Sequence, residues 1–159
     1  MKHKFLLVLA STIFGLVFLQ NEITAQSGAR FQYYFTETPM FKLGYELSTY
    51  DGDNNVYAGF NIFFASGYSK PIGLDLVIGG DIILNRYSGD VKLLVNIEGG
   101  FYGTWVDGES RTGLNAAVGP GVLVDTDFMR FVVRGGPQFF LIKDGSMITW
   151  GLGLSVYLP

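Results

Sequence analysis

Eight charged residues of this 159-residue chain stand in stretches where apolar residues alternate with small or polar ones. They are Lys42, Glu46, Asp75, Asp81, Lys92, Glu98, Arg130 and Arg134. Such groups could form charge-assisted hydrogen bonds with one another, act as acid and base, or line an ion path. Because four are positive and four are negative, mutual neutralisation is the favoured interpretation, and a gated ion path is the alternative.

Residues for nucleophilic or metal chemistry are scarce. The chain has no cysteine, and its one histidine is His3. The part of the chain after His3 therefore cannot form a Ser–His or Cys–His catalytic pair, or a thiolate or imidazole metal site. Paired carboxylates for glycoside hydrolysis could come only from Glu46, Asp75 and Glu98, and no cleft is implied. We predict no enzyme activity, no cofactor and no metal.

One turn superficially resembles a calcium-binding loop. Asp51, Asp53 and Asn55 place oxygen ligands at alternate positions. The twelfth position of such a loop needs an acidic side chain, and Ile62 stands there. We predict an ordinary turn.

Alternation of apolar and polar residues recurs eight times, as strands with one apolar face require. The predicted strands are 29–36, 41–50, 56–66, 72–86, 91–105, 112–124, 129–142 and 147–158. The short connections between them carry Gly, Asn, Asp, Ser or Pro, the residues that turn a chain most readily. We predict an all-β fold, an eight-stranded antiparallel up-and-down barrel.

Residue size indicates which face lies inside. One face carries bulky side chains such as Phe41, Leu43 and Ile72, and the other is rich in Gly, Ser, Asn and Gln. The interior of an eight-stranded barrel is only just wide enough to be filled by side chains, so the small face fits inside. An apolar exterior suits lipid, and the charged fraction of 16% is low. We therefore predict a transmembrane barrel; the alternative is a soluble exported barrel that binds a small apolar ligand.

Equal spacing from the predicted turns places Glu98 and Arg134 opposite each other across Gly119. Proline removes a ladder hydrogen bond, so we expect bulges at 119–121 and 135–137, around Pro120 and Pro137.

Aromatic residues near strand ends are expected to form an interfacial girdle. They are Tyr50, Tyr57, Tyr68, Tyr87, Trp105 and Tyr157.

The first 25 residues are typical of a secretory leader. Lys2 and Lys4 precede an apolar run over 5–19, which is short of the roughly 20 residues that span a bilayer. Ala25 before Gln26 fits the cleavage site. We predict a signal peptide at 1–25 and a barrel domain at 26–159. Without the leader, nine basic and 13 acidic residues are left, which argues against a nucleic-acid partner.

The chain after the leader resembles the small eight-stranded outer-membrane barrel families, especially the compact barrels of Bacteroidota-like bacteria. The likeness rests on the Ala25-Gln26 junction and on the alternating last strand, 151–159, which departs from the family signal by ending in Pro159 instead of Phe. Family members with lipid-modifying activity depend on a histidine that the predicted mature chain lacks.

The resemblance implies a monomer in the cell outer membrane whose partners are membrane lipid and the insertion machinery. It also implies a non-enzymatic structural or surface-interaction role, with a narrow, porin-like pore as the weaker alternative. If both termini face the periplasm, the longest outer connection would be 106–111. A large extracellular recognition surface is therefore not expected.

Overall fold

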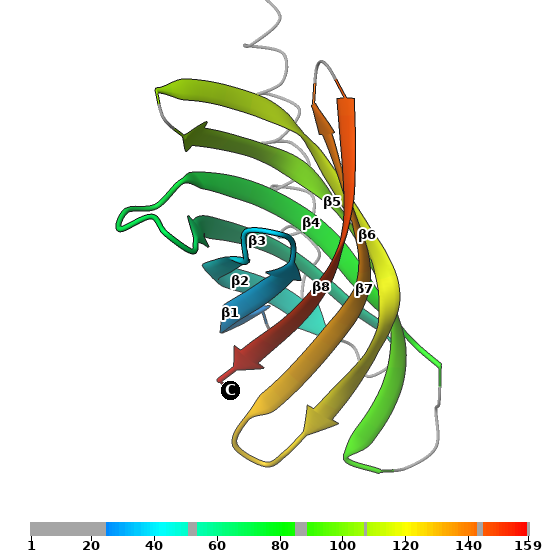
Figure 1. Ribbon diagram of the computed structural model, residues 1–159. Coiled ribbons are helices and arrows are strands. Elements are labelled where there is room, and N and C mark those ends of the chain that lie inside the picture. Colours follow the sequence, from blue (N-terminus) through cyan, green and yellow to red (C-terminus); the bar gives the residue numbers. More distant parts are fainter. Residues whose placement is uncertain (1–24, 51–53, 85–88, 107, 143–144, 159) are drawn as a thin grey trace, which may run out of the picture.

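The computed structural model describes residues 25–50, 54–84, 89–106, 108–142 and 145–158. Eight strands run through these ranges, and Figure 1 shows their arrangement. They are β1 (Ala25–Phe35), β2 (Met40–Tyr50), β3 (Asn54–Ala65), β4 (Gly73–Ile83), β5 (Val91–Val106), β6 (Glu109–Asp125), β7 (Arg130–Ile142) and β8 (Gly145–Tyr157). No helix in the described ranges is long and apolar enough to cross a membrane. Of the predicted leader, only Ala25 lies within the described residues.

Each strand pairs antiparallel with the next, and β8 pairs with β1 to close the barrel. Closure satisfies the edges that an open sheet would leave unpaired. The first hairpin aligns Phe31 with Leu43 and Tyr33 with Phe41, so apolar faces match apolar faces across it. The predicted eight-stranded up-and-down barrel is confirmed.

Most strand ends differ from the prediction by one to four residues. β1 begins at Ala25, four residues before the predicted start, because its ladder with β2 continues to Thr49. The β5–β6 ladder extends to the pair Val106 and Glu109, and Gly108 has a positive φ of 83° at the tip. The predicted 106–111 loop is therefore wrong. The longest connection at the end of the barrel away from the termini is 66–72.

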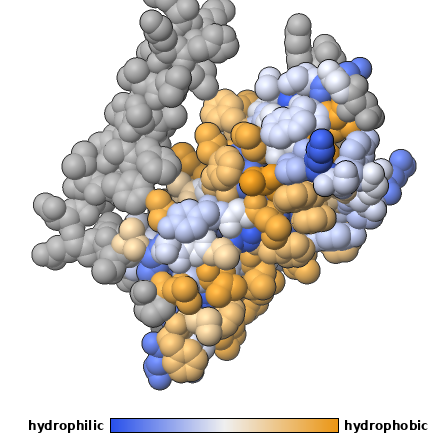
Figure 2. All heavy atoms as spheres, turned by 90° about the vertical axis from the view of Figure 1, so that its left-hand side faces the viewer, coloured by the Kyte–Doolittle hydropathy of each residue, from blue (hydrophilic) through white to orange (hydrophobic). Residues whose placement is uncertain are grey.

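Bulky apolar side chains cover the outside. Leu76, Phe101 and Leu152 are 49–56% exposed, and Figure 2 shows apolar residues spread over the visible flank. No charged residue takes an outward position in the described strands. One member of the predicted outer face, Ile72, is instead 6% exposed, since it precedes β4 and packs against buried Phe63 and Tyr102.

The predicted aromatic girdle is wrong for half of its members. Tyr57 and Tyr157 are 1% and 0% exposed, and Tyr50 packs against an interior cluster. Strand parity turns all three inward, where their hydroxyl groups contact Glu98, Glu46 and Lys92, respectively. Tyr68 and Trp105 are exposed as expected. Tyr87 lies outside the described residues.

The interior consists of three layers along the barrel axis. The end nearest the termini holds the inner cap, an apolar cluster of Ile83, Leu94, Leu123, Val132 and Tyr157. The opposite end holds the outer cap, a cluster of Tyr34, Phe63, Ala65, Ile72, Tyr102 and Phe140. Most buried polar and charged side chains occupy the middle, and buried Arg130 lies beside the inner cap.

Glycines make room for two interior tyrosines. Gly79 pairs with Tyr57 across β3 and β4, and a Cβ at Gly79 would lie 2.8 Å from Cε2 of that ring. Gly28 pairs with Tyr157, and a Cβ there would lie 2.6 Å from its Cδ1. Each phenol ring therefore lies against a partner strand that carries no side chain at the point of contact.

The predicted proline bulges are wrong. On β6 and β7, Ala117 pairs with Gln138 and Gly121 with Arg134, so the register is the same on both sides of the prolines. A bulge would shift it by one residue. Between these pairs the ladder is interrupted without an extra residue. Gly119 and Gly136 face each other there, and a Cβ on either would lie 2.9 Å from the other's Cα.

We predict that Gly79→Ala destabilises the barrel by about 1–3 kcal/mol, because the new methyl group overlaps the Tyr57 ring. Urea unfolding in lipid vesicles, followed by gel mobility, measures the effect. Gly99→Ala is the matched control, since a Cβ there has its nearest neighbour at 3.9 Å. An equal loss of stability in the two variants would contradict the packing argument.

Candidate functional site

Arg134 on β7 is the centre of the buried charges. Its Nε donates to Asp81 Oδ1 at 2.9 Å and its Nη2 to Asp81 Oδ2 at 2.6 Å, a two-point contact between guanidinium and carboxylate. Nη2 also donates to Glu46 Oε1 at 3.1 Å, and Nη1 donates to Ser155 Oγ at 2.8 Å. The guanidinium carbon lies 4.2 Å from the centre of the Tyr57 ring. One cation thus joins β7 to β2, β4 and β8.

Glu46 on β2 is fully buried and receives several donors. Arg30 on β1 donates from Nη1 to its Oε2 at 3.2 Å, and Ser155 Oγ donates to the same oxygen at 3.3 Å. The Tyr157 hydroxyl donates to Oε1. Burying an unpaired carboxylate is very unfavourable, and these donors together with Arg134 replace the water that Glu46 loses.

Glu98 on β5 completes the central network. Arg30 Nη2 lies 2.6 Å from Glu98 Oε2, and the Tyr57 hydroxyl donates to the same oxygen at 2.8 Å. Asn96 Nδ2 donates to the Tyr57 hydroxyl at 2.7 Å and to Asp81 Oδ1 at 2.9 Å. Glu98 and Asp81 are therefore linked through neutral side chains.

A second group lies under the outer cap. Lys42 on β2 forms an ion pair with Asp75 on β4, and both are buried. Asn61 and Asn115 also donate to Asp75, at 2.7 and 3.0 Å. The Lys42 ammonium lies 4.6 Å from the centre of the Phe63 ring, at the distance of a cation–π contact.

A third group lies at the end near the termini. Arg130 Nη1 donates to Gln26 Oε1 at 2.6 Å, and its Nε lies 3.4 Å from Asp125 Oδ1. The Lys92 ammonium donates to the Tyr50 hydroxyl. The Arg130 guanidinium stacks over the Tyr50 ring at 3.8 Å.

All eight sequence-predicted charges lie on the interior side of the wall, in these three groups. The predicted contact between Glu98 and Arg134 is wrong. Glu98 pairs in register with Ala117, and Arg134 pairs with Gly121, so two-residue shifts in the β5–β6 and β6–β7 hairpins separate them. Glu98 binds Arg30 instead, and Arg134 binds Asp81 and Glu46.

Arg30 is absent from the predicted set. It is 4% exposed and bridges Glu46 and Glu98. Phe31, Tyr33 and Phe35 form the outward face of this strand. The same alternation, extended to the residue before Phe31, would have placed Arg30 inside. Asp125, which contacts Arg130 from an inward position on β6, is also absent from the predicted set. Adding these two residues to the predicted eight gives five basic and five acidic residues, so the positive and negative charges still balance.

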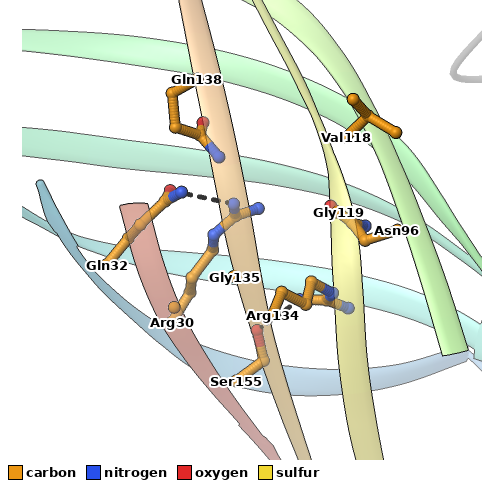
Figure 3. A pocket seen from close by; sticks show the side chains of 10 residues that line it. Arg30, Gln32, Asn96, Val118, Gly119, Arg134, Gly135, Gln138 and Ser155 are labelled. Atoms are coloured by element: carbon orange, nitrogen blue, oxygen red, sulfur yellow. Dashed lines mark hydrogen bonds between the residues drawn. The ribbon is translucent and has the colours of Figure 1, made fainter. Parts of the chain in front are cut away.

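The middle of the network leaves little free space. The cavity among these side chains has a volume of about 10 Å³, room for about one water molecule. Figure 3 shows Arg30, Gln32 and Gln138 converging on it, with Arg134 and Ser155 below. Gly119 and Gly135, from the interrupted stretch of the β6–β7 ladder, also line it.

The carboxylates that were candidates for hydrolytic chemistry are all paired with basic side chains. Of the carboxylates considered for glycoside hydrolysis, Glu46 and Glu98 share Arg30, whereas Asp75 binds Lys42. Within the described ranges, no group of three or more His, Cys, Asp or Glu side chains is placed to hold a metal ion.

The calcium-like turn is only partly described. Two of its three oxygen ligands, at positions 51 and 53, lie outside the described residues. The third, the amide of Asn55, is buried and donates to Asp81 at 2.7 Å. That side chain therefore belongs to the interior network.

No protein-family model matches the sequence, and a sequence search of curated proteins gives no match. The fold is similar to solved barrels. The N-terminal β-barrel domain of Pseudomonas aeruginosa OprF superposes with a TM-score of 0.61 at 11% identity, over 84% of this chain and 96% of that one. Neisserial surface protein A gives a TM-score of 0.63 at 11% identity, over 84% and 94%.

A third similar structure is the Yersinia pestis outer membrane protein Ail, with a TM-score of 0.44 at 15% identity over 84% of this chain and 99% of that one. OprF and neisserial surface protein A support the barrel fold. The Bacteroidota-like part of the predicted resemblance stays a prediction.

We predict that Arg134→Gln and Asp81→Asn are strongly coupled in a double-mutant cycle. The two-point contact is lost in either single variant, so the coupling free energy should be about 1–3 kcal/mol. Unfolding in lipid vesicles measures it. Asp75→Asn is the control partner for Arg134→Gln, because Asp75 and Arg134 share no hydrogen-bond partner and their effects should add. Equal coupling in the two cycles would contradict the assigned network.

Proposed function

We propose that this chain is a non-enzymatic integral barrel of the outer membrane, closed to ion flow, with a structural or surface-interaction role. One observation carries the proposal: buried ion pairs fill the centre of a closed barrel whose described outer face is apolar. This is the reverse of the usual arrangement in water, where charges lie outside and apolar groups inside.

Strand length supports a position in the membrane. A transmembrane β-strand needs about 9–11 residues, and each strand here has at least 11. Backbone groups in hydrocarbon must be paired internally, which a closed barrel achieves. Outward residues such as Ile97, Leu114 and Trp150 are 46–63% exposed, a large apolar surface that lipid would cover.

The predicted leader fits this location. Cleavage after Ala25 would remove only the first residue of β1 and keep the ladder from Gln26 onward. The proposed partners are membrane lipid and the machinery that inserts barrels, and the proposed state is a monomer. Short connections at the end away from the termini favour a structural role or a small contact surface.

The filled interior favours a closed barrel over the porin-like alternative. Arg30, Arg134 and Glu46 cross the lumen, and the cavity between them has space for about one water molecule. An ion would have to break these pairs to pass. Removing one partner from a buried pair typically costs about 3–5 kcal/mol, because a charge is left without compensation.

Expression of the full chain in a Gram-negative host tests the location. We expect the protein in the outer-membrane fraction, with an N-terminus at Gln26 by mass spectrometry and faster gel migration before heating than after. Recovery as a detergent-free soluble monomer would overturn the proposal and favour the soluble exported barrel.

Planar lipid bilayers test whether the barrel is closed. The reconstituted protein should give no unitary conductance steps at either polarity, while a known porin at the same protein-to-lipid ratio serves as the positive control. Reproducible steps whose size changes in Glu98→Gln would instead support the ion path.

A further inference from the structure

The outer cap borders a pocket that the closed-barrel proposal does not use. It has a volume of about 250 Å³ and lies at the end of the barrel away from the termini. Its lining residues come from β2, β3, β5, β6, β7 and β8 and from the connection before β4: Met40, Phe63, Ile72, Tyr102, Thr104, Val106, Arg111, Phe140, Ser146 and Met147.

The lining of this pocket is unusual for its position. Phe63, Tyr102 and Phe140 form an aromatic wall with ring centres 5.3–6.5 Å apart. Met147 occupies an inward position on β8 and is nevertheless 42% exposed. A barrel mouth that meets only water would not need an apolar lining, so this surface is suited to an apolar occupant. Methionine side chains such as Met40 and Met147 adapt readily to varied apolar shapes.

The pocket is closed on its inner side. The Lys42 ammonium lies 4.6 Å from the centre of the Phe63 ring and 5.8 Å from that of Phe140, and it is paired with Asp75. Beyond this pair lies the filled centre of the barrel. The arrangement therefore suits retention of a ligand at the mouth and not its passage through the lumen.

A second cavity, three of whose four lining residues are polar or charged, adjoins the apolar one. It has a volume of about 410 Å³ and shares Thr104, Val106 and Arg111 with the pocket, adding Glu109. Arg111 is largely exposed and donates to Glu109 at 2.9 Å. The two cavities thus meet at the Arg111 guanidinium group, which can bind a carboxylate through two parallel hydrogen bonds.

We propose that this pocket binds a small single-chain amphiphile with an anionic head, such as a medium-chain fatty acid. The hydrocarbon chain lies against Phe63, Tyr102 and Phe140, and the carboxylate meets Arg111. The volume supports this size, because a cavity of about 150 Å³ accommodates benzene and drug-sized ligands need about 300 Å³ or more. The inference rests on the proposed function only for placing the pocket at the outer surface.

Methionine methyl groups offer a direct test. The chain has four methionines, and Met40 and Met147 line the pocket whereas Met129 lies between β6 and β7 at the opposite end. The protein is labelled with ¹³C at the methionine methyls, inserted into lipid nanodiscs and titrated with decanoate below its micelle concentration. We expect saturable shifts at Met40 and Met147, with direct NOEs from decanoate protons, and no saturable shift at Met129. Shifts that do not saturate, or that are equal at Met129, would mean partition into the bilayer and would overturn the proposal.

Two matched substitutions locate the site. Thr104→Phe fills the pocket and should abolish the saturable shifts, whereas Thr112→Phe, on the outward side of the neighbouring strand, should leave them unchanged. Binding that persists in Thr104→Phe would overturn the assignment. If Thr104→Phe does not fold, the NOEs in the unsubstituted protein decide.

The charged head is tested with Arg111→Gln. This change should weaken decanoate binding about three-fold, the scale of one exposed charge contact, and leave decanol binding unchanged. An equal loss for the two ligands would overturn the head-group assignment. Failure of the barrel to enter nanodiscs would count against the membrane proposal, whereas absent shifts in a well-inserted barrel would count against the pocket alone.

Discussion

Arg134 on β7 donates to Asp81 on β4 and to Glu46 on β2, two strands that do not neighbour β7. The lumen of an eight-stranded barrel is narrow, so charged side chains inside it must satisfy one another across its width. Arg30 on β1 likewise crosses the lumen to Glu98 on β5, and it also contacts Glu46 on the neighbouring β2. A member of this central network without its partners would be a buried, uncompensated charge. The network and the closed barrel wall therefore depend on each other.

The same constraint explains where the large residues lie. Inward tyrosines such as Tyr57 and Tyr157 bring hydroxyl donors to Glu98 and Glu46, and glycines on the paired strands make space for their rings. The two apolar caps enclose the polar middle at both ends of the lumen. The outer cap additionally borders the pocket beside Phe63, whereas Lys92 and Arg130 lie beside the inner cap, so the two ends of the interior differ.

Most of the fold follows from alternation in the sequence, because side-chain parity is a local property of each strand. Parity also placed Glu46, Asp81 and Arg134 inside. It could not identify their partners, since a two-residue slip keeps every side chain on its face and changes every cross-strand contact. The predicted pairing of Glu98 with Arg134 was wrong for this reason. The prediction of proline bulges was wrong because Gly119 and Gly136 let the backbones of β6 and β7 approach each other without an extra residue.

The central claim is that the apolar outer face contacts lipid while the polar face fills the lumen. The chain has no cysteine, so single cysteines can carry a nitroxide at Leu152 and Leu154, which point outward on β8. In lipid vesicles, these labels should collide readily with oxygen and rarely with a water-soluble nickel chelate, unlike a label at exposed Thr126. Nickel accessibility at Leu152 and Leu154 equal to that at Thr126 would contradict the account.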